Sequence, residues 1–130
     1  MILVDSSVWI DFFAGRKTKA TSYVIKSIEE SSDLCTCGLI LTEVLQGIRS
    51  DKEYENVKEI LSDLIYLPIS KNTFIHASSI YRSLRKSGKT IRSPIDCIIA
   101  TICLEHEIML LHNDKDFIAI AQHTKLQIVD

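Results

Sequence analysis

The sequence lacks a long apolar run, since none of its hydrophobic stretches approaches the ~20 residues that a membrane-spanning helix needs. It also lacks a positively charged segment followed by an extended apolar stretch at the N-terminus, which is the pattern of a secretory signal peptide. Internal repeats, low-complexity tracts and linker-like segments are absent as well. We therefore expect a cytoplasmic protein without membrane association, with one domain over residues 1–130.

Cysteine is present, but its spacing does not fit a metal site or a disulfide framework. The four cysteines form no C-x-x-C pair, and no histidine lies at zinc-finger spacing beside them. Reduced, partly buried thiols in a cytosolic protein are the favoured interpretation. These cysteines are Cys35, Cys37, Cys97 and Cys103.

Strong positive charge, the usual mark of a dedicated nucleic-acid binder, is also missing. The formal net charge is −2 and the pI is about 6.1. A pocket of carboxylates would contribute negative charge that a bound metal ion cancels, and local basic patches can exist within a neutral total. With 46% hydrophobic and 25% charged residues, the composition is that of a globular domain, and nucleic-acid binding is not excluded.

Short apolar, partly β-branched runs alternate with amphipathic helical patterns along the whole chain. This alternation predicts an α/β fold with a parallel sheet and helices on both of its faces. The predicted strands span residues 2–4, 34–37, 108–111 and 126–129, with a short extended piece at 66–69. Helices are predicted over residues 7–15, 19–30, 39–48, 54–65 and 71–88, from Pro94 onward, and after Asp114.

Acidic residues follow two of the predicted strands. Asp5 comes directly after the first strand, and Asp114 and Asp116 follow the strand at 108–111. In open parallel α/β sheets, ligands bind outside the carboxyl ends of the strands. These two stretches could therefore deliver carboxylates to the same edge of the sheet.

Two further acids lie within apolar helical stretches. Glu43 interrupts the pattern at 39–48, and Asp96 lies in the first turn of the helix that begins at Ser93-Pro94. Charged residues in such positions are rarely buried without partners. Clustered carboxylates repel one another and raise at least one pKa, a cost that a hard divalent cation removes. Without Cys or His at ligand spacing, Mg²⁺ or Mn²⁺ is favoured over zinc.

Each acid also has a structural interpretation that needs no metal. Asp5 and Asp114 could cap the helices that follow them. Asp96 could be a first-turn acid stabilised by the helix dipole. Glu43 has no such alternative among its apolar neighbours. The joint pattern of the acids, more than any one of them, predicts a shared metal site.

Four segments together resemble the PIN domain, and their order and spacing are most similar to the VapC toxins of prokaryotic toxin–antitoxin systems. The segments are residues 2–11 (ILVDSSVWID), 41–47 (LTEVLQG), 93–100 (SPIDCIIA) and 111–117 (LHNDKDF). The first and last are the more specific. The resemblance extends from end to end of the chain.

The resemblance implies a PIN-like three-layer α/β/α sandwich with a central, mostly parallel sheet. It implies a Mg²⁺-dependent, or alternatively Mn²⁺-dependent, endoribonuclease that is the toxin of a type II toxin–antitoxin system. Its expected partners are the RNA substrate, a cognate antitoxin protein and a second copy in a homodimer. The implied catalytic and metal-binding acids are Asp5, Glu43, Asp96 and Asp114, with Asp116 as an auxiliary metal-site acid and Ser7 as a support for Asp5.

Within this site, Asp5, Asp96 and Asp114 are expected mainly to bind metal, whereas Glu43 either binds metal or orients the attacking water. Cations around the pocket would hold the RNA, and the main candidates are Arg85, Lys89 and Arg92. The wider set of candidate cations adds Arg16, Lys17, Arg82 and Lys86. A solvated helix end explains these cations equally well.

Two other functions compete with the ribonuclease hypothesis. A haloacid-dehalogenase-like phosphatase also begins with a strand followed by Asp, but it requires a second Asp two residues later, where this sequence has Ser7. A non-catalytic, protein-binding PIN module would be expected to have lost some of the acids, and all are present here.

Overall fold

The computed structural model describes all residues from 1 to 130. The strands are β1 (Ile2–Val4), β2 (Leu34–Thr36), β3 (Ile65–Tyr66) and β4 (Met109–Leu111). The helices are α1 (Ser6–Phe13), α2 (Lys19–Glu29), α3 (Gly38–Leu45), α4 (Asp51–Ser62), α5 (Lys71–Lys86), α6 (Pro94–His106) and α7 (Lys115–His123).

The four strands form one sheet in the order β3-β2-β1-β4, and every strand pair is parallel. β1 therefore lies inside the sheet, between β2 and β4. Leu3 and Val4 are fully buried there, as expected for a strand that is covered on both faces. Because the strands are parallel, the segments that follow β1 and β4 leave the sheet at the same edge.

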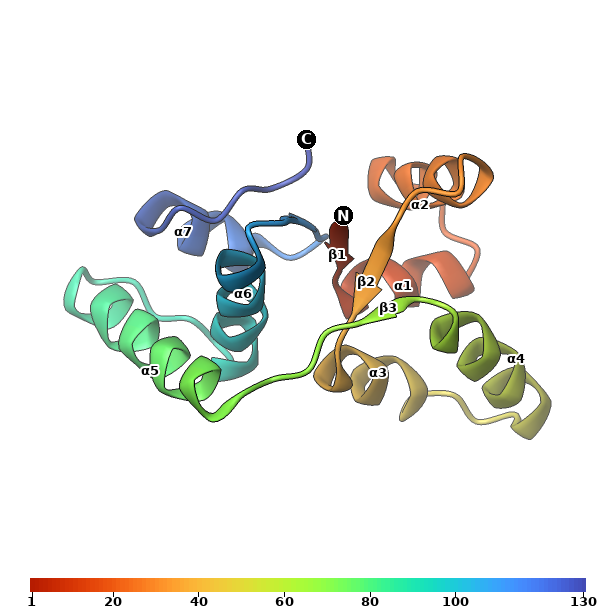
Figure 1. Cartoon of the computed structure of the whole chain (residues 1–130), viewed down its shortest axis with the longest axis horizontal. Coiled ribbons are helices and arrows are strands. Elements are labelled where there is room, and N and C mark those ends of the chain that lie inside the picture. The colour runs from red at the N-terminus through yellow and green to blue at the C-terminus, as the bar shows by residue number, and fades with distance from the viewer.

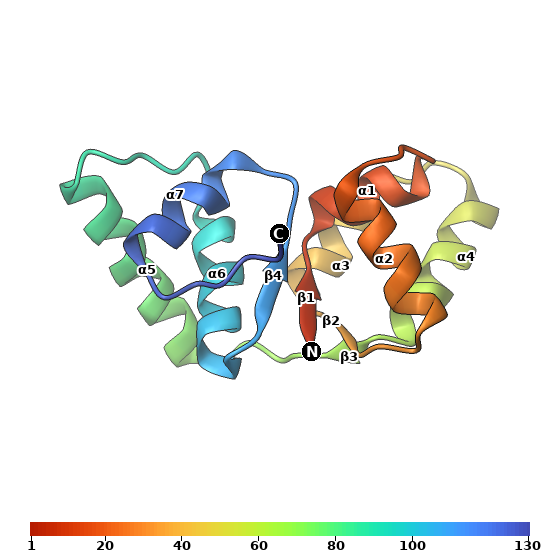
Figure 2. The same cartoon turned by 90° about the horizontal axis from the view of Figure 1, so that it is seen from above.

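The helices form two layers with the sheet between them. Figures 1 and 2 show α1–α4 on one side of the sheet and α5–α7 on the other. The predicted α/β/α architecture is thus the observed one. A core of 27 buried apolar residues fills the interior, and Trp9 and Phe117 are its largest fully buried side chains. None of the seven helices combines the length and the apolar character that crossing a bilayer requires.

Side chains at the helix ends explain where several helices begin and stop. The hydroxyl groups of Thr18, Ser50, Ser70 and Ser93 each accept a backbone N–H in the first turn of the following helix. Pro94 occupies the first position of α6, where its missing N–H costs nothing. These signals are local, which is why the sequence predicts most helices correctly.

Several predicted boundaries were wrong. The segment 126–129 is not a strand, since it forms a single bridge, between Leu110 and Ile128, on the outer edge of β4. β4 has only three residues, so it offers this segment a short partner. The helix predicted at 54–65 begins at Asp51 and ends at Ser62, because Ser50 caps its first turn and Ile65 pairs with Cys35 in the sheet.

Candidate metal centre

Asp5 is held at the carboxyl end of β1, next to the end of β4. Its backbone N–H donates to the carbonyl oxygen of Leu111 at 2.9 Å, which joins the two strand ends. Its carboxylate accepts two hydrogen bonds from Ser7, at 3.1 Å from the backbone N–H and at 2.6 Å from the hydroxyl group. Asp5 is therefore the N-cap of α1, as the metal-free interpretation predicts.

The carboxylate of Asp5 is nevertheless in a costly environment for a charge. The residue is only 4% exposed. Burial raises its pKa above the ordinary value, the hydrogen bonds from Ser7 partly oppose this shift, and the nearby charge of Asp114 adds to it. A helix cap alone would not require this burial, and a bound cation would remove the penalty.

Glu43 reaches toward the same edge from α3. Its carboxylate accepts a hydrogen bond from the Ser6 hydroxyl group at 3.2 Å. Burial, followed by the charge of Asp5, raises the pKa of Glu43. Glu43, the acid that interrupts the apolar pattern of α3, therefore contacts Ser6 and is influenced by the negative charge of Asp5.

Three other acids converge more tightly. One carboxylate oxygen from each of Asp96, Asp114 and Asp116 lies within 4.8 Å of the other two. Asp96 stands in the first turn of α6, and Asp114 and Asp116 stand at the start of α7. The structure thus brings together the carboxyl end of β4 and the N-terminal end of α6.

Asp96 shows the strongest electrostatic effect of this convergence. Burial raises the pKa of Asp96 to about 7, and the charges of the four other acids contribute in the same direction. Those acids, in order of influence, are Asp114, Asp5, Asp116 and Glu43. Four of the five acids chosen from the sequence therefore act on the carboxyl group of the fifth, Asp96, although Asp5 and Glu43 lie outside the tight group of three.

His112 orients the start of α7. Its Nδ1 accepts the backbone N–H of Asp114 at 3.1 Å, and its ring packs against Phe117 with 5.2 Å between centroids. Burial lowers the pKa of His112, which favours the neutral ring that this acceptor role needs. Asp114 in turn caps α7 by accepting the N–H of Asp116 at 3.0 Å.

Among the predicted RNA-binding residues, Arg92 alone contacts the acids. Its Nε donates to Asp116 Oδ2 at 3.1 Å, and its Nη2 donates to Asp114 Oδ1 at 3.2 Å. The side chain remains 69% exposed. Lys89 is exposed in the same loop, and Arg85 lies 5.9 Å from the ring centroid of Tyr81 on α5.

Two residues near the site, Asn113 and Asp11, were not identified as site residues from the sequence. Asn113 donates its backbone N–H to the Ser7 hydroxyl group at 3.0 Å and its side-chain amide to Asp11 Oδ2 at 2.7 Å. Asp11 also pairs with Arg16 at 2.7 Å. Asp11 and Asn113 are 102 positions apart, so no local pattern could have revealed their contact.

The donor set fits a hard divalent cation. The atoms available to bind a metal ion are all carboxylate oxygens, which Mg²⁺ and Mn²⁺ prefer as ligands. Softer ligands are less available near the acids, because His112 Nδ1 already accepts a backbone N–H and burial raises the pKa of the Cys97 thiol to about 11. The cluster can therefore hold a metal ion, as the sequence predicts.

Comparison with known proteins gives a consistent result. The sequence matches the PIN domain family model over residues 2–122. It is 33% identical over 129 residues to ribonuclease VapC11 of Mycobacterium tuberculosis, covering 98% of this chain and 96% of that protein. It is 29% identical over 118 residues to ribonuclease VapC1 of Methanocaldococcus jannaschii, covering 89% and 78% respectively.

The fold is also similar to solved structures. The crystal structure of DNA-bound VapBC from Salmonella typhimurium contains a chain that superposes with a TM-score of 0.78 at 20% identity. The match covers 99% of this chain and 96% of that one. At this identity the likeness concerns the fold, and it agrees with the parallel sheet and seven helices described above.

Proposed function

Because this chain belongs to the PIN domain family, and within it to the VapC proteins, we propose that it is a Mg²⁺- or Mn²⁺-dependent endoribonuclease that acts as the toxin of a toxin–antitoxin pair. The substrate is RNA, and the reaction is hydrolysis of a phosphodiester bond. The observation that carries the proposal is the group of three carboxylates within 4.8 Å, at the sheet edge where Asp5 also ends β1.

The roles of the acids are assigned as the resemblance to the PIN domain implies. Asp5, Asp96 and Asp114 would hold the metal ion, and Asp116 would support it through water. When bound, the ion supplies Lewis acidity toward the phosphate and lowers the pKa of a water molecule. Ser7 keeps the Asp5 carboxylate in one orientation through its two hydrogen bonds.

Glu43 is the acid best suited to handle the proton of the attacking water. It lies outside the tight group of three, as Asp5 does, but unlike Asp5 it comes from helix α3 and not from the end of a strand that borders this group. Its raised pKa makes it a better proton acceptor than an ordinary surface glutamate, and Ser6 fixes one of its oxygens. We assign Glu43 to orienting this water and accepting its proton.

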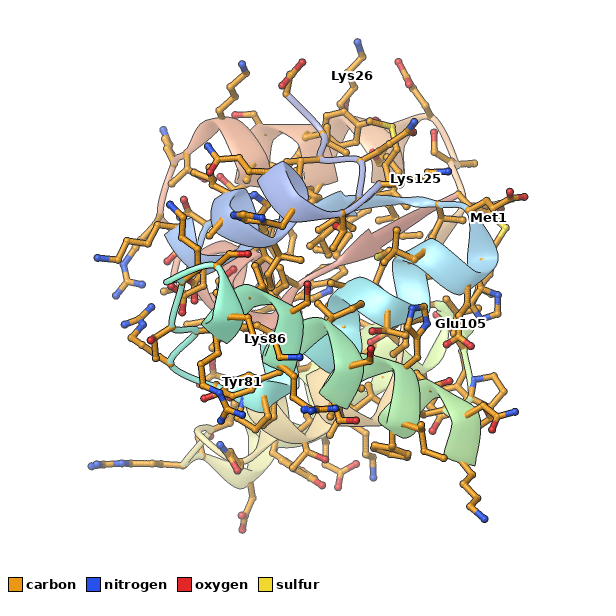
Figure 3. All side chains as sticks on the ribbon, turned by 90° about the vertical axis from the view of Figure 1, so that its left-hand side faces the viewer. Met1, Lys26, Tyr81, Lys86, Glu105 and Lys125 are labelled. Carbon is orange, nitrogen blue, oxygen red and sulfur yellow. The ribbon has the colours of Figure 1, made fainter.

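RNA would approach over the loop between α5 and α6. Arg92, which contacts Asp114 and Asp116, lies in this loop with Lys89, and Arg85 lies in the last turn of α5; all three are exposed. Figure 3 shows Tyr81 and Lys86 at the surface of the same end of α5. Phosphate contacts from these cations would position the strand without reading its sequence.

An antitoxin segment would cover an apolar groove next to the site. A groove of about 220 Å³ is lined by apolar side chains of α1 and α3, including Ile10 and Val44, together with Glu43 and Glu53. An amphipathic segment with a basic residue fits this chemistry, and such a segment would also block Glu43. The homodimer would use the outer surface of α5, where Phe74 and Ile75 are exposed.

The deciding experiment is RNA cleavage with Mn²⁺ or Mg²⁺ by the wild type and by Asp5→Asn, Asp96→Asn and Asp63→Asn. Removing a metal ligand should reduce metal-dependent cleavage by roughly 100-fold or more, since several kcal/mol of charge stabilisation are lost. Asp63 is an exposed acid at the end of α4, so its variant should cleave like the wild type.

Undiminished metal-dependent cleavage in both Asp5→Asn and Asp96→Asn would contradict the site assignment. A wild-type protein that neither binds Mn²⁺ nor cleaves any RNA would contradict the enzymatic function, and would favour the protein-binding PIN module instead.

A further inference from the structure

We propose that Asn113 and Asp11 form a latch that sets the relative position of the two halves of the acidic site. The latch is the pair of contacts that Asn113 makes with α1, through its backbone N–H to Ser7 and its side chain to Asp11. The inference rests on the proposed function, since it assigns positioning residues to that same site.

The geometry of α1 makes both contacts possible at once. Ser7 and Asp11 are four residues apart, so they lie on the same face of the helix. Asn113 lies against this face in the loop between β4 and α7, and it donates at 3.0 Å to Ser7 Oγ and at 2.7 Å to Asp11 Oδ2. Two donors from one residue therefore hold the loop against one turn of α1.

The contact with Ser7 extends to Asp5. A hydroxyl group has one proton, and the Ser7 hydroxyl donates it to Asp5 Oδ2 at 2.6 Å. Because the same oxygen accepts the N–H of Asn113, its proton points away from the loop and toward Asp5. The position of Asn113 thus helps to fix the orientation of the Asp5 carboxylate.

The other half of the site is joined to Asn113 by the chain itself. Asp114 is the next residue, and its carboxylate belongs to the group that includes Asp96 and Asp116. A loop that moved away from α1 would carry Asp114 with it and would release Ser7. One residue therefore couples Asp5, which follows β1, to Asp114, which caps α7.

Asp11 is a firm anchor for this latch. One of its oxygens accepts from Arg16 at 2.7 Å and the other accepts from Asn113, and its side chain is only 15% exposed. Hydrogen bonds to an ionised carboxylate are stronger than neutral ones. Asp11 itself is part of α1 and lies away from the group of three acids, so its effect on a metal ion would act through Asn113.

The test compares Mn²⁺ affinity, measured by calorimetry, in Asp11→Ala, Asn113→Ala, the double variant and Arg16→Ala. Each single latch variant should weaken Mn²⁺ binding by roughly 3- to 10-fold, at or below the range seen when residues that orient metal ligands are replaced. The double variant should be no weaker than the worse single variant, because both substitutions break the same contact. Asp11→Asn, which retains an acceptor oxygen, should recover part of the loss.

Arg16→Ala is the matched control, because it removes the other partner of Asp11 and leaves the contact with Asn113 in place. Its Mn²⁺ affinity should stay within about twofold of the wild type, since the Arg16 side chain is 63% exposed and an ion pair with such an exposed cation contributes little. Unchanged affinity in both latch variants, or an equal loss in Arg16→Ala, would overturn the proposal.

A second readout is independent of metal. In the metal-free protein, the backbone N–H of Asn113 should exchange with solvent several-fold faster in Asp11→Ala than in the wild type or Arg16→Ala. Unaltered exchange would refute the latch. A wild type that neither binds Mn²⁺ nor cleaves RNA would refute the proposed function, while the exchange measurement would still decide on the contact itself.

Discussion

Arg92 and Asp96 differ in how their charges are balanced within the site. Arg92 uses one oxygen of Asp114 and one of Asp116, which leaves the second oxygen of each carboxylate without a protein donor. Asp96 has no hydrogen-bond donor, so its charge is opposed by burial and by its acidic neighbours. The free oxygens are therefore those that a cation would need.

The raised pKa of Asp96 predicts that the stability of the metal-free protein depends on pH. Its pKa is about 7 in the folded state against an ordinary 3.8, so the folded state holds a proton that the unfolded state has released. Stability should fall as the pH rises from about 4 through about 7 and then level off. Asp96→Asn removes this titration, so its advantage over the wild type should grow between pH 5 and pH 8.

After allowance for solvent screening, this growth should be on the order of 1 to 2 kcal/mol in the free energy of unfolding. Urea denaturation at the two pH values, in the presence of a chelator, measures it. Asp63→Asn should show no such pH trend. A constant difference between Asp96→Asn and the wild type across this range would mean that Asp96 titrates normally.

Among the helices and strands, those specified by residues close together in the sequence were predicted, and those that depend on distant partners were not. The strands β1, β2 and β4 and most helix starts were predicted, because apolar runs and capping side chains lie within a few residues of one another. The strand predicted at 126–129 was wrong, because the apolar residues of this segment do not reveal that β4 offers only three residues to pair with. Pairing partners are decided by tertiary structure.

In the candidate site, too, the features that depend on local sequence were predicted and the contacts between distant residues were not. The five acids could be selected from strand ends and from charges in apolar helices, and the structure brings three of them within 4.8 Å. The contacts of Arg92 with Asp114 and Asp116 join positions 22 and 24 residues apart, and no periodic pattern encodes them. The loop conformations that create such contacts were therefore beyond sequence reasoning.

The N-cap of α6 provides a prediction for a single helix. The Ser93 hydroxyl group accepts the N–H of Ile95 at 3.2 Å in the turn that carries Asp96. Ser93→Ala should cost about 1 kcal/mol of stability and should also weaken Mn²⁺ binding a few-fold, because the turn that presents Asp96 frays. Denaturation and Mn²⁺ titration of the same sample check both effects.

Ser70→Ala is the comparison for this experiment, since Ser70 caps α5 through the N–H of Thr73 at 3.3 Å and α5 carries none of the acids. It should lose similar stability without losing Mn²⁺ affinity. Equal effects of the two variants on Mn²⁺ binding would indicate that the cap of α6 has no special connection to the site.

For the whole molecule, the acids come from both helical layers and from the sheet between them. Glu43 belongs to α3 on one side, Asp96 belongs to α6 on the other, and Asp5 follows the inner strand β1 (Figures 1 and 2). A cation bound among these acids would join the two layers and relieve their mutual repulsion. The stability of the entire fold should therefore depend on metal.

Mn²⁺ at 100 times its dissociation constant should stabilise the protein by about 2.7 kcal/mol, because ligand binds the folded state alone. For a chain of this size, such a gain corresponds to a rise of roughly 10 °C in the midpoint of thermal unfolding. Scanning calorimetry of the wild type, Asp63→Asn and Asp96→Asn measures it, with NaCl at equal ionic strength to account for screening. The wild type and Asp63→Asn should gain equally, and Asp96→Asn should gain little. A full gain in Asp96→Asn would show that Mn²⁺ stabilises the fold from a different site, since the group of three acids would then be dispensable.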